Sequence, residues 1–266
     1  MKLESYIVNA FSENLAEGNP AGVIIYKESI PDELMLKIAI DMGKSETAFI
    51  RRINNTEYTI RWFSPNKEMT LCGHATLAAS KVLFDTFNYR YITFKSFANQ
   101  YNVEIKQDES ISMKFPLDDY APLEKQEIYN DFFENIEIEE CFYGTKTKKV
   151  VLVIKENCNI KLIKPKYEYM FQNKGIYSNG IGITKKSTSA DFETRYFNPW
   201  AGVNEDPVTG SVHTLLAKYW GDTLGKSHLI AKQVSYRPGI INLEIDSNYV
   251  HISGKAKIVF QGKLTI

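Results

Sequence analysis

The segment EDPVTGSVHTLLA, residues 205–217, resembles an earlier segment of the same chain, EMTLCGHATLAA, residues 68–79. A second pair of matching segments precedes them, because RWFSP at 61–65 corresponds to RYFNP at 195–199. In both copies an aromatic-rich strand ends at a proline, a glycine marks a turn, and an apolar run follows. Internal similarity over this distance indicates two structural repeats, each containing a strand, a turn and a helix.

The apolar run after each glycine predicts a buried helix. The first helix begins at His74, and its residues 75–84 leave almost no polar face, which is typical of a helix inside a protein core. The second helix is expected over Ser211–Trp220. Short alternating or β-branched runs surround both helices and predict strands. We therefore expect an α+β protein of two pseudo-symmetric, barrel-like lobes, each a β-sheet wrapped around a central helix.

The two repeats suggest a division of the chain into two lobes. Halves of about 130 residues fall inside the usual range of domain sizes. The polar, proline-containing stretch 115–126 is the expected connection. We predict an N-terminal lobe over 1–118 and a C-terminal lobe over 119–266, and leave open whether the final strand returns to the first lobe.

Composition argues against several classes of protein. The 32 basic and 32 acidic residues balance, so no basic field is present to hold nucleic acid or an anionic membrane. The cysteines Cys72, Cys141 and Cys158 form neither a disulfide framework nor a CxxC metal motif, and no metal site is predicted. No segment reaches the ~18 to 20 apolar residues of a membrane span. We expect a cytoplasmic protein.

The N-termini of the two predicted helices are candidate anion-binding sites. Each helix starts at a glycine followed by a polar residue, Gly73-His74 and Gly210-Ser211. The N–H groups of a helix's first turn need acceptors, and the helix dipole favours a negative one. A glycine without a side chain lets such a ligand approach the backbone. If the lobes face each other, both N-termini line one cleft that binds a carboxylate.

Four motifs in order along the chain resemble one family: GNPAGV (18–23), SETAF (45–49), FSPNKEMTLCGHATLAA (63–79) and EDPVTGSVH (205–213). Together they are similar to the PhzF family of phenazine-biosynthesis isomerase-like proteins, whose fold is that of diaminopimelate epimerase. GKLTI near the end of the chain fits the closing strand of that fold. The resemblance implies a biosynthetic isomerase that works without a cofactor on a small, cyclic carboxylic acid, and that forms a homodimer.

The resemblance also implies roles for particular residues. Glu46 is implied to be the catalytic acid/base, with His74 and Asp206 completing the catalytic set. The implied substrate-binding residues are two glycines that donate backbone N–H groups, a serine, and the asparagine of the first motif: Gly73, Gly210, Ser211 and Asn19.

One departure from epimerases of this fold bears on the type of reaction. Those enzymes carry a cysteine before the glycine at both helix N-termini, one to take a proton and one to return it. This chain has Cys72 at the first position and Thr209 at the second. A threonine hydroxyl has too high a pKa for that role unless a strong base lies beside it. We therefore expect a carboxylate, rather than a pair of thiols, to transfer the proton.

The position of Glu46 supports its assignment as that carboxylate. It opens the predicted strand ETAFI, where Ala48 and Ile50 share its face in the alternation. Carboxylates are rarely buried without a partner. We predict that burial raises the pKa of Glu46 toward the working pH, as suits a group that must accept and return a proton.

Other interpretations of these residues stay open. Glu46 could be a structural residue whose carboxylate is paired with backbone N–H groups or with an arginine. Cys72 could be a small buried filler, and His74 could only cap its helix. Asp206 and its neighbour Glu205 could be acids that complement the helix dipole.

Three residues are kept out of the predicted site. His213 lies two positions after Ser211 and should point elsewhere, because helical residues at that spacing do not share a face. Arg61 and Arg195 occupy matched positions of the two repeats, as structural strand residues would.

Three functional classes follow from these alternatives. The leading one is an isomerase that moves a proton on a small carboxylic acid. The second is a small-acid-binding protein or an inactive homologue that uses the same cleft. The third is a hydrolase with Cys72 as nucleophile, which the closeness of Cys72 and His74 along the chain disfavours.

Overall fold

The computed structural model describes residues 2–124, 127–173 and 179–266 of the chain. The chain divides into two compact units. The first unit combines Met1–Lys114 with Ser253–Ile266, and the second is Phe115–Ile252. The predicted lobe boundary after residue 118 lies inside the expected connecting stretch 115–126, whose residues 125 and 126 lie outside the described residues.

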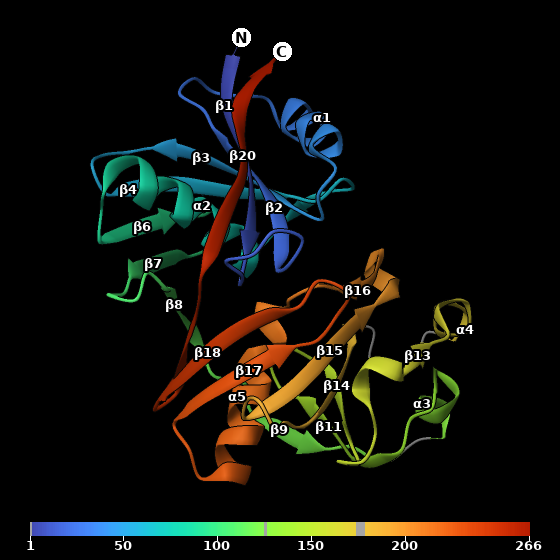
Figure 1. Ribbon diagram of the computed structural model, residues 1–266. Helices are drawn as coiled ribbons and strands as arrows, with labels where there is room; N and C mark the ends of the chain where they lie inside the picture. The colour runs from blue at the N-terminus through green and yellow to red at the C-terminus, as the bar shows by residue number, and fades with distance from the viewer. Residues whose placement is uncertain (1, 125–126, 174–178) are drawn as a thin grey trace. The chain divides into compact units, whose positions relative to one another are not determined.

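The first unit is a sheet with two helices (Figure 1). Its helices are α1 (Asp32–Met42) and α2 (Gly73–Phe87). Its strands are β1 (Lys2–Ala10), β2 (Asn19–Ile25), β3 (Thr47–Arg52), β4 (Glu57–Phe63), β5 (Glu68–Met69), β6 (Tyr91–Lys95), β7 (Gln100–Ile105), β8 (Ile111–Pro116) and β20 (Ala256–Thr265). Paired strands follow the order β20-β1-β2-β3-β4-β6-β7-β8, and β5 pairs with β4.

The second unit repeats this plan with additional short elements. Its helical segments are α3 (Ile128–Asp131), η1 (Ile160–Leu162), α4 (Tyr167–Gln172), η2 (Pro199–Ala201) and α5 (Gly210–Leu224). Its strands are β9 (Tyr120–Pro122), β10 (Phe133–Glu134), β11 (Ile138–Gly144), β12 (Val150–Ile154), β13 (Lys164–Pro165), β14 (Ile181–Lys186), β15 (Phe192–Asn198), β16 (Val203–Asp206), β17 (His228–Gln233), β18 (Gly239–Asp246) and β19 (Tyr249–Gly254). The main pairing order is β9-β11-β12-β14-β15-β17-β18, and β16 pairs with β15.

The two units share one topology. In the first unit the pairs β2–β3 and β4–β6 are parallel and the other pairs are antiparallel. In the second unit the corresponding pairs β12–β14 and β15–β17 are parallel. A parallel pair needs a crossover connection, and α2 and α5 supply it at matched places in the two units. The predicted α+β class with two related halves is confirmed.

The two crossover helices are buried, as their apolar sequences predict. Most side chains of α2 and of α5 are excluded from solvent. Helix α2 lies against β1, β2 and β20, and α5 lies against β17 and β18. A tryptophan–threonine hydrogen bond ties each helix to the sheet of its unit, with the roles reversed. The Trp62 indole of β4 donates to Thr76 of α2 at 3.1 Å, and the Trp220 indole of α5 donates to Thr184 of β14 at 3.0 Å. Helix α5 extends beyond the predicted end at Trp220.

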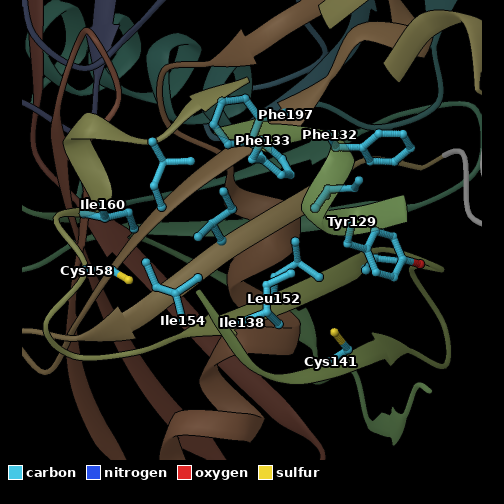
Figure 2. Packing of buried hydrophobic residues seen from close by; sticks show 14 of the residues in the cluster. Tyr129, Phe132, Phe133, Ile138, Cys141, Leu152, Ile154, Cys158, Ile160 and Phe197 are labelled. Atoms are coloured by element: carbon cyan, nitrogen blue, oxygen red, sulfur yellow. The ribbon is translucent and has the colours of Figure 1, made fainter. Parts of the chain in front are cut away.

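A separate apolar cluster stabilises the second unit around β12, β14 and the short helices. Figure 2 shows the aromatic side chains of Phe132, Phe133 and Phe197 with Leu152 and Ile160 in this cluster. The rings of Phe133 and Phe197 pack with centroids 5.3 Å apart. Since Phe197 belongs to β15, the cluster fixes one face of the strand that leads to the N-terminus of α5.

Candidate active site

Glu46 occupies the position directly before β3, and pairing between parallel strands holds its backbone. The Gly22 N–H donates to the Glu46 carbonyl at 3.0 Å, and Gly22 lies opposite Thr47 in the β2–β3 register. A Cβ atom at Gly22 would lie 2.6 Å from the Thr47 hydroxyl. Glycine at this position therefore allows β2 to approach β3 closely enough to place Glu46.

The Glu46 side chain contacts His74 at the start of α2. Glu46 Oε2 lies 3.2 Å from His74 Nε2, and both side chains are largely buried, with exposed fractions of 15% and 9%. The Ser45 hydroxyl lies 3.5 Å from the same His74 nitrogen. The structure thus brings together Glu46 and His74, which are far apart in sequence, and adds Ser45, which the motif comparison did not single out.

Cys72 completes this cluster. Its Sγ lies 3.5 Å from His74 Nδ1 and 3.9 Å from His74 Nε2. Closeness along the chain therefore does not prevent a thiol–imidazole contact, contrary to the sequence-based expectation. Burial raises the pKa of the Cys72 thiol, and the nearby His74 lowers it only in part. The thiol is protonated at neutral pH.

The ionisation of Glu46 differs from the prediction. Burial by itself raises the pKa of Glu46, but the hydrogen bond and charge of His74, with a hydrogen bond from Ser45, lower it below its ordinary value. The prediction of a raised pKa is wrong because it considered burial without the partner. Burial likewise disfavours the imidazolium, yet the contacts with Cys72 and Glu46 raise the pKa of His74 well above its ordinary value. Since the thiol is neutral, Glu46 is the anion that stabilises the imidazolium.

Of the other predicted residues in the first unit, Gly73 is the first residue of α2 and Asn19 is buried at the start of β2, opposite Ala10. The N-terminus of α2 has no capping hydrogen bond from the side chain of its N-cap residue, Cys72. Amide donors of the first turn are therefore available to a ligand.

In the second unit, Asp206 lies at the end of β16, close to the N-terminus of α5. The Thr209 hydroxyl donates to Asp206 Oδ2 at 2.6 Å. Thr209 makes no side-chain capping bond to α5, Gly210 is the first helical residue, and Ser211 is exposed. A Cβ atom added at Gly210 would meet no protein atom within 4 Å, so open space lies beside this part of the backbone.

Gln233, which sequence reasoning missed, organises this helix N-terminus. Its fully buried side chain accepts from the Thr209 N–H at 2.9 Å and donates to the Asp206 carbonyl at 2.6 Å. Ser235 donates to the same carbonyl at 3.2 Å. Both residues lie outside the four motifs, and a single glutamine in a strand forms no sequence pattern that marks it as functional.

Lys149 is a second residue that the sequence did not indicate. Its Nζ donates to the Tyr196 hydroxyl at 2.6 Å, and Tyr196 pairs with Asp206 in the β15–β16 register. Burial lowers the pKa of Lys149 to about 8, although Asp206 and Asp118 act in the opposite direction. In the sequence this lysine stands among several others, in KTKKV.

Four residues that the sequence analysis considered or kept out of the site have structural roles. The Arg61 guanidinium makes a two-bond ion pair with Glu68, and Arg195 makes the matching pair with Glu205. Glu205 of β16 is therefore paired with an arginine of the neighbouring strand β15. His213 is fully buried, and its Nδ1–H donates to the Thr209 carbonyl at 2.6 Å. Burial lowers the pKa of His213 to about 4, so its ring is neutral.

A hollow of about 400 Å³ in the second unit is lined in part by Arg195, Glu205, Tyr236 and Pro238. It contains none of the predicted catalytic residues. In the described part of the chain, no helix has the length and apolar character that a bilayer crossing requires.

Two units of shared topology, each with a buried helix whose N-cap residue makes no side-chain capping bond, define a protein with the epimerase-type fold. A hydroxyproline epimerase from Agrobacterium vitis, at 8% identity, has a TM-score of 0.60 over 99% of this chain and 92% of its own, which shows the fold alone.

Residues 8–262 match the family model described as phenazine biosynthesis-like protein. An uncharacterized isomerase of Halalkalibacterium halodurans is 34% identical over 98% of both chains. The crystal structure of a PhzF-family phenazine biosynthesis protein of Enterococcus faecalis is 34% identical, with a TM-score of 0.93 and full coverage of both chains. The chain belongs to the phenazine biosynthesis-like (PhzF) family, and it is an isomerase.

Proposed function

We propose that the protein moves a proton on a small, cyclic carboxylic acid without a cofactor, with Glu46 as the general acid/base. The observation that carries this proposal is the contact of 3.2 Å between Glu46 and His74 at the uncapped N-terminus of α2. It gives one carboxylate, one imidazole and a set of backbone donors in one place. These groups suffice for proton transfer and for holding an anion.

The lowered pKa of Glu46 means that this carboxylate is ionised, and so able to accept a proton, at neutral pH. A strongly stabilised carboxylate is a weak base, however. A substrate carboxylate or developing enolate offers the His74 imidazolium a second anion to bind. Sharing of the imidazolium weakens its hold on Glu46 and raises the pKa of Glu46 in the complex. Glu46 then takes a proton from one carbon and returns it at another.

The further substrate contacts are proposed from the motifs and local geometry. Gly73 and the first turn of α2 donate N–H groups to the acid. Asp206, Gly210, Ser211 and Asn19 are proposed to contact the rest of the substrate. The homodimer is proposed from the family resemblance, and the cytoplasmic location from the composition of the sequence.

The contact between Cys72 and His74 makes a Cys72-based hydrolase the alternative to consider. A nucleophilic cysteine needs a base that takes its proton. Here the thiol pKa is raised, and His74 is held as the imidazolium by Glu46, so it has no free site for that proton. Proton transfer by Glu46 is the better supported function.

Proton exchange with solvent tests the proposal directly. A panel of cyclic and amino carboxylic acids is incubated with the protein in deuterium oxide, and deuterium incorporation is followed by NMR. Glu46→Gln keeps the shape and hydrogen bonding of the side chain but cannot accept the proton. We expect it to retain ligand binding while exchange slows by at least ~10²-fold, the usual scale of a general-base loss.

Glu104→Gln, at an exposed position of β7, is the matched control and should leave exchange unchanged. Near-normal exchange in Glu46→Gln would remove Glu46 from the mechanism. Tight binding of an acid by the wild type, with no exchange in any member of the panel, would favour the small-acid-binding protein instead.

A further inference from the structure

The cluster of Glu46, Cys72 and His74 has a second chemical capacity besides proton transfer. One ligand atom from each side chain, an oxygen, a sulfur and a nitrogen, lies within 4.8 Å of the other two. His74 Nε2 is 3.2 Å from Glu46 Oε2 and 3.9 Å from Cys72 Sγ. Across residues 2–124, 127–173 and 179–266, no other trio of histidine, cysteine or acidic side chains gathers its ligand atoms this closely.

These separations suit a tetrahedral metal ion. Zinc binds cysteine sulfur at ~2.3 Å and histidine nitrogen or carboxylate oxygen at ~2.0 to 2.2 Å. Two ligands at such distances on neighbouring corners of a tetrahedron lie between about 3.3 and 3.7 Å apart. The nitrogen–oxygen and nitrogen–sulfur separations differ from these values by a few tenths of an ångström. The oxygen and sulfur atoms lie within 4.8 Å of each other, and side-chain torsions can bring all three atoms to one metal ion.

The donor set also selects the metal. Thiolate and imidazole are ligands for zinc and other borderline or soft ions, whereas magnesium and calcium take oxygen ligands. Three protein ligands leave one tetrahedral position for water or for a substrate oxygen. The cluster has a single carboxylate, so it offers little to a hard cation.

We propose that Glu46, Cys72 and His74 form a zinc-binding site, and that zinc bound there inhibits the protein. Coordination takes the thiolate and the neutral imidazole, so the thiol and imidazolium protons pass to solvent as zinc binds. The carboxylate that would accept the substrate proton then becomes a metal ligand. The inhibitory part of the proposal rests on the proposed function of Glu46, whereas the binding part does not.

Binding is measured first, without any substrate. Zn²⁺ is titrated by calorimetry into protein freed of metal by a chelator, with Mg²⁺ as the comparison ion. We expect one tight zinc site per chain and no magnesium binding. Co²⁺, used as a coloured substitute for zinc, should give the near-ultraviolet absorption of a thiolate–cobalt bond. A wild type that binds no zinc, or a cobalt complex without the thiolate band, would overturn the site.

Variants then assign the ligands. Cys72→Ser should weaken zinc binding by at least about tenfold and abolish the thiolate band, since even residues that only orient a ligand cost about 10- to 100-fold. Cys141→Ser is the matched control, because Cys72 and Cys141 are both 7% exposed. Thermal unfolding of each variant shows that it is folded. Equal zinc affinity in wild type and Cys72→Ser, or loss of the band in Cys141→Ser, would contradict the assignment.

The metal site and the enzymatic proposal fail in different ways. Zinc binding that depends on Cys72, together with solvent exchange that survives in Glu46→Gln, would uphold the site and overturn the catalytic role of Glu46. Exchange that depends on Glu46 but continues at saturating zinc would overturn the inhibition. We expect zinc to stop exchange by the wild type and excess chelator to restore it.

Discussion

At the scale of single residues, the pairing of Glu46 with His74 controls the charge of both groups. Each is held in its ionised form by the other, against the effect of burial. The pair therefore contributes to the stability of the fold as well as to the proposed chemistry, and the two contributions can be separated by their dependence on pH.

The stabilising effect of the pair should depend on pH in both directions. The pKa of Glu46 is lowered in the fold, so its contribution is present above the unfolded value of ~4.3 and is lost as the pH falls through the folded pKa. The pKa of His74 is raised, so its contribution is present below ~6.5 and is lost as the pH rises through the folded pKa. We expect the difference in unfolding midpoint between wild type and His74→Gln to be largest between about pH 4.5 and 6.5.

The measurement is a series of thermal unfolding midpoints across that range for both proteins. The pKa of His213 is lowered to about 4, so this residue destabilises the wild type and His74→Gln equally as the pH falls. Its effect therefore cancels in the difference between their unfolding midpoints. His228→Gln, on an exposed histidine, serves as the control. A difference that stays constant with pH would show that the two groups are not ionised together.

Some of this residue-level picture could be predicted from the sequence. The motifs identified Glu46 and His74, but no pattern in one chain reports that side chains 28 positions apart meet. Alternation along β3 does not distinguish a buried face for Glu46 either, because Thr47, Ala48, Phe49 and Ile50 are all buried and β3 has no solvent-facing side there. The sign of the Glu46 pKa shift depends on its partner, so it needed the structure.

At the scale of elements, the close approach of β2 and β3 positions Glu46. Gly22→Ala places a methyl group 2.6 Å from the Thr47 hydroxyl and 3.1 Å from the end of the Met42 side chain. We expect a loss of about 1 to 3 kcal/mol in the free energy of unfolding, as for other overpacked sites. Urea denaturation measures the loss, and solvent exchange should fall with it as β3 and Glu46 shift.

Gly210→Ala is the same substitution at a position where the added carbon meets no protein atom. It should leave the free energy of unfolding within about 0.5 kcal/mol of wild type, as for substitutions away from packed sites. If a ligand lies against this backbone, acid binding measured by calorimetry weakens nonetheless. Full binding in Gly210→Ala would remove this glycine from the substrate contacts.

Gln233 should prove necessary for the N-terminus of α5. Gln233→Met keeps the length of the side chain but leaves the Thr209 N–H and the Asp206 carbonyl without this partner. A buried group left unsatisfied costs roughly 1 to 3 kcal/mol, which urea denaturation can detect. Gln100→Met, on the exposed first residue of β7, is the control. Equal stability of the two variants would contradict the role of Gln233.

The helices themselves were predictable because their apolar runs are long and begin at a glycine. The end of α5 was not, since the sequence after Trp220 is a glycine followed by polar residues, yet the helix continues to Leu224 and stops where Gly225 adopts a left-handed conformation. The contacts of Gln233 depend on which strand lies beside the helix N-terminus, and that is a property of the assembled sheet.

At the scale of the whole molecule, the repeat found in the sequence extends to strand order and to matching ion pairs. Arg61 with Glu68 and Arg195 with Glu205 occupy equivalent places, but their surroundings differ. The Arg61 side chain is 28% exposed, whereas Arg195 is 9% exposed and also donates to the carbonyls of Ile160 and Ile163. The repeated sequence could predict that both ion pairs form. It could not predict which of the two pairs is buried by other residues of the same unit.

Equivalent substitutions in the two copies should therefore have unequal effects. Arg195→Met leaves Glu205 buried without its partner, and we expect a loss of roughly 3 to 5 kcal/mol in the free energy of unfolding. Arg61→Met breaks a more exposed pair and should cost much less. Urea denaturation of both variants gives the comparison. Similar losses would show that burial does not distinguish the two pairs.

The pairing of β20 with β1 along their full length has a consequence for how the protein is made (Figure 1). A ribosome releases the chain from its N-terminus, and segments generally fold as they emerge. The second unit is one continuous segment, so it can fold as soon as Ile252 has been released. The first unit begins earlier but lacks β20 until Ala256–Thr265 has been synthesised. The unit that carries Glu46 is therefore the later of the two to be complete, and a chain that stops before residue 256 has every residue of the second unit but lacks strand β20 of the first.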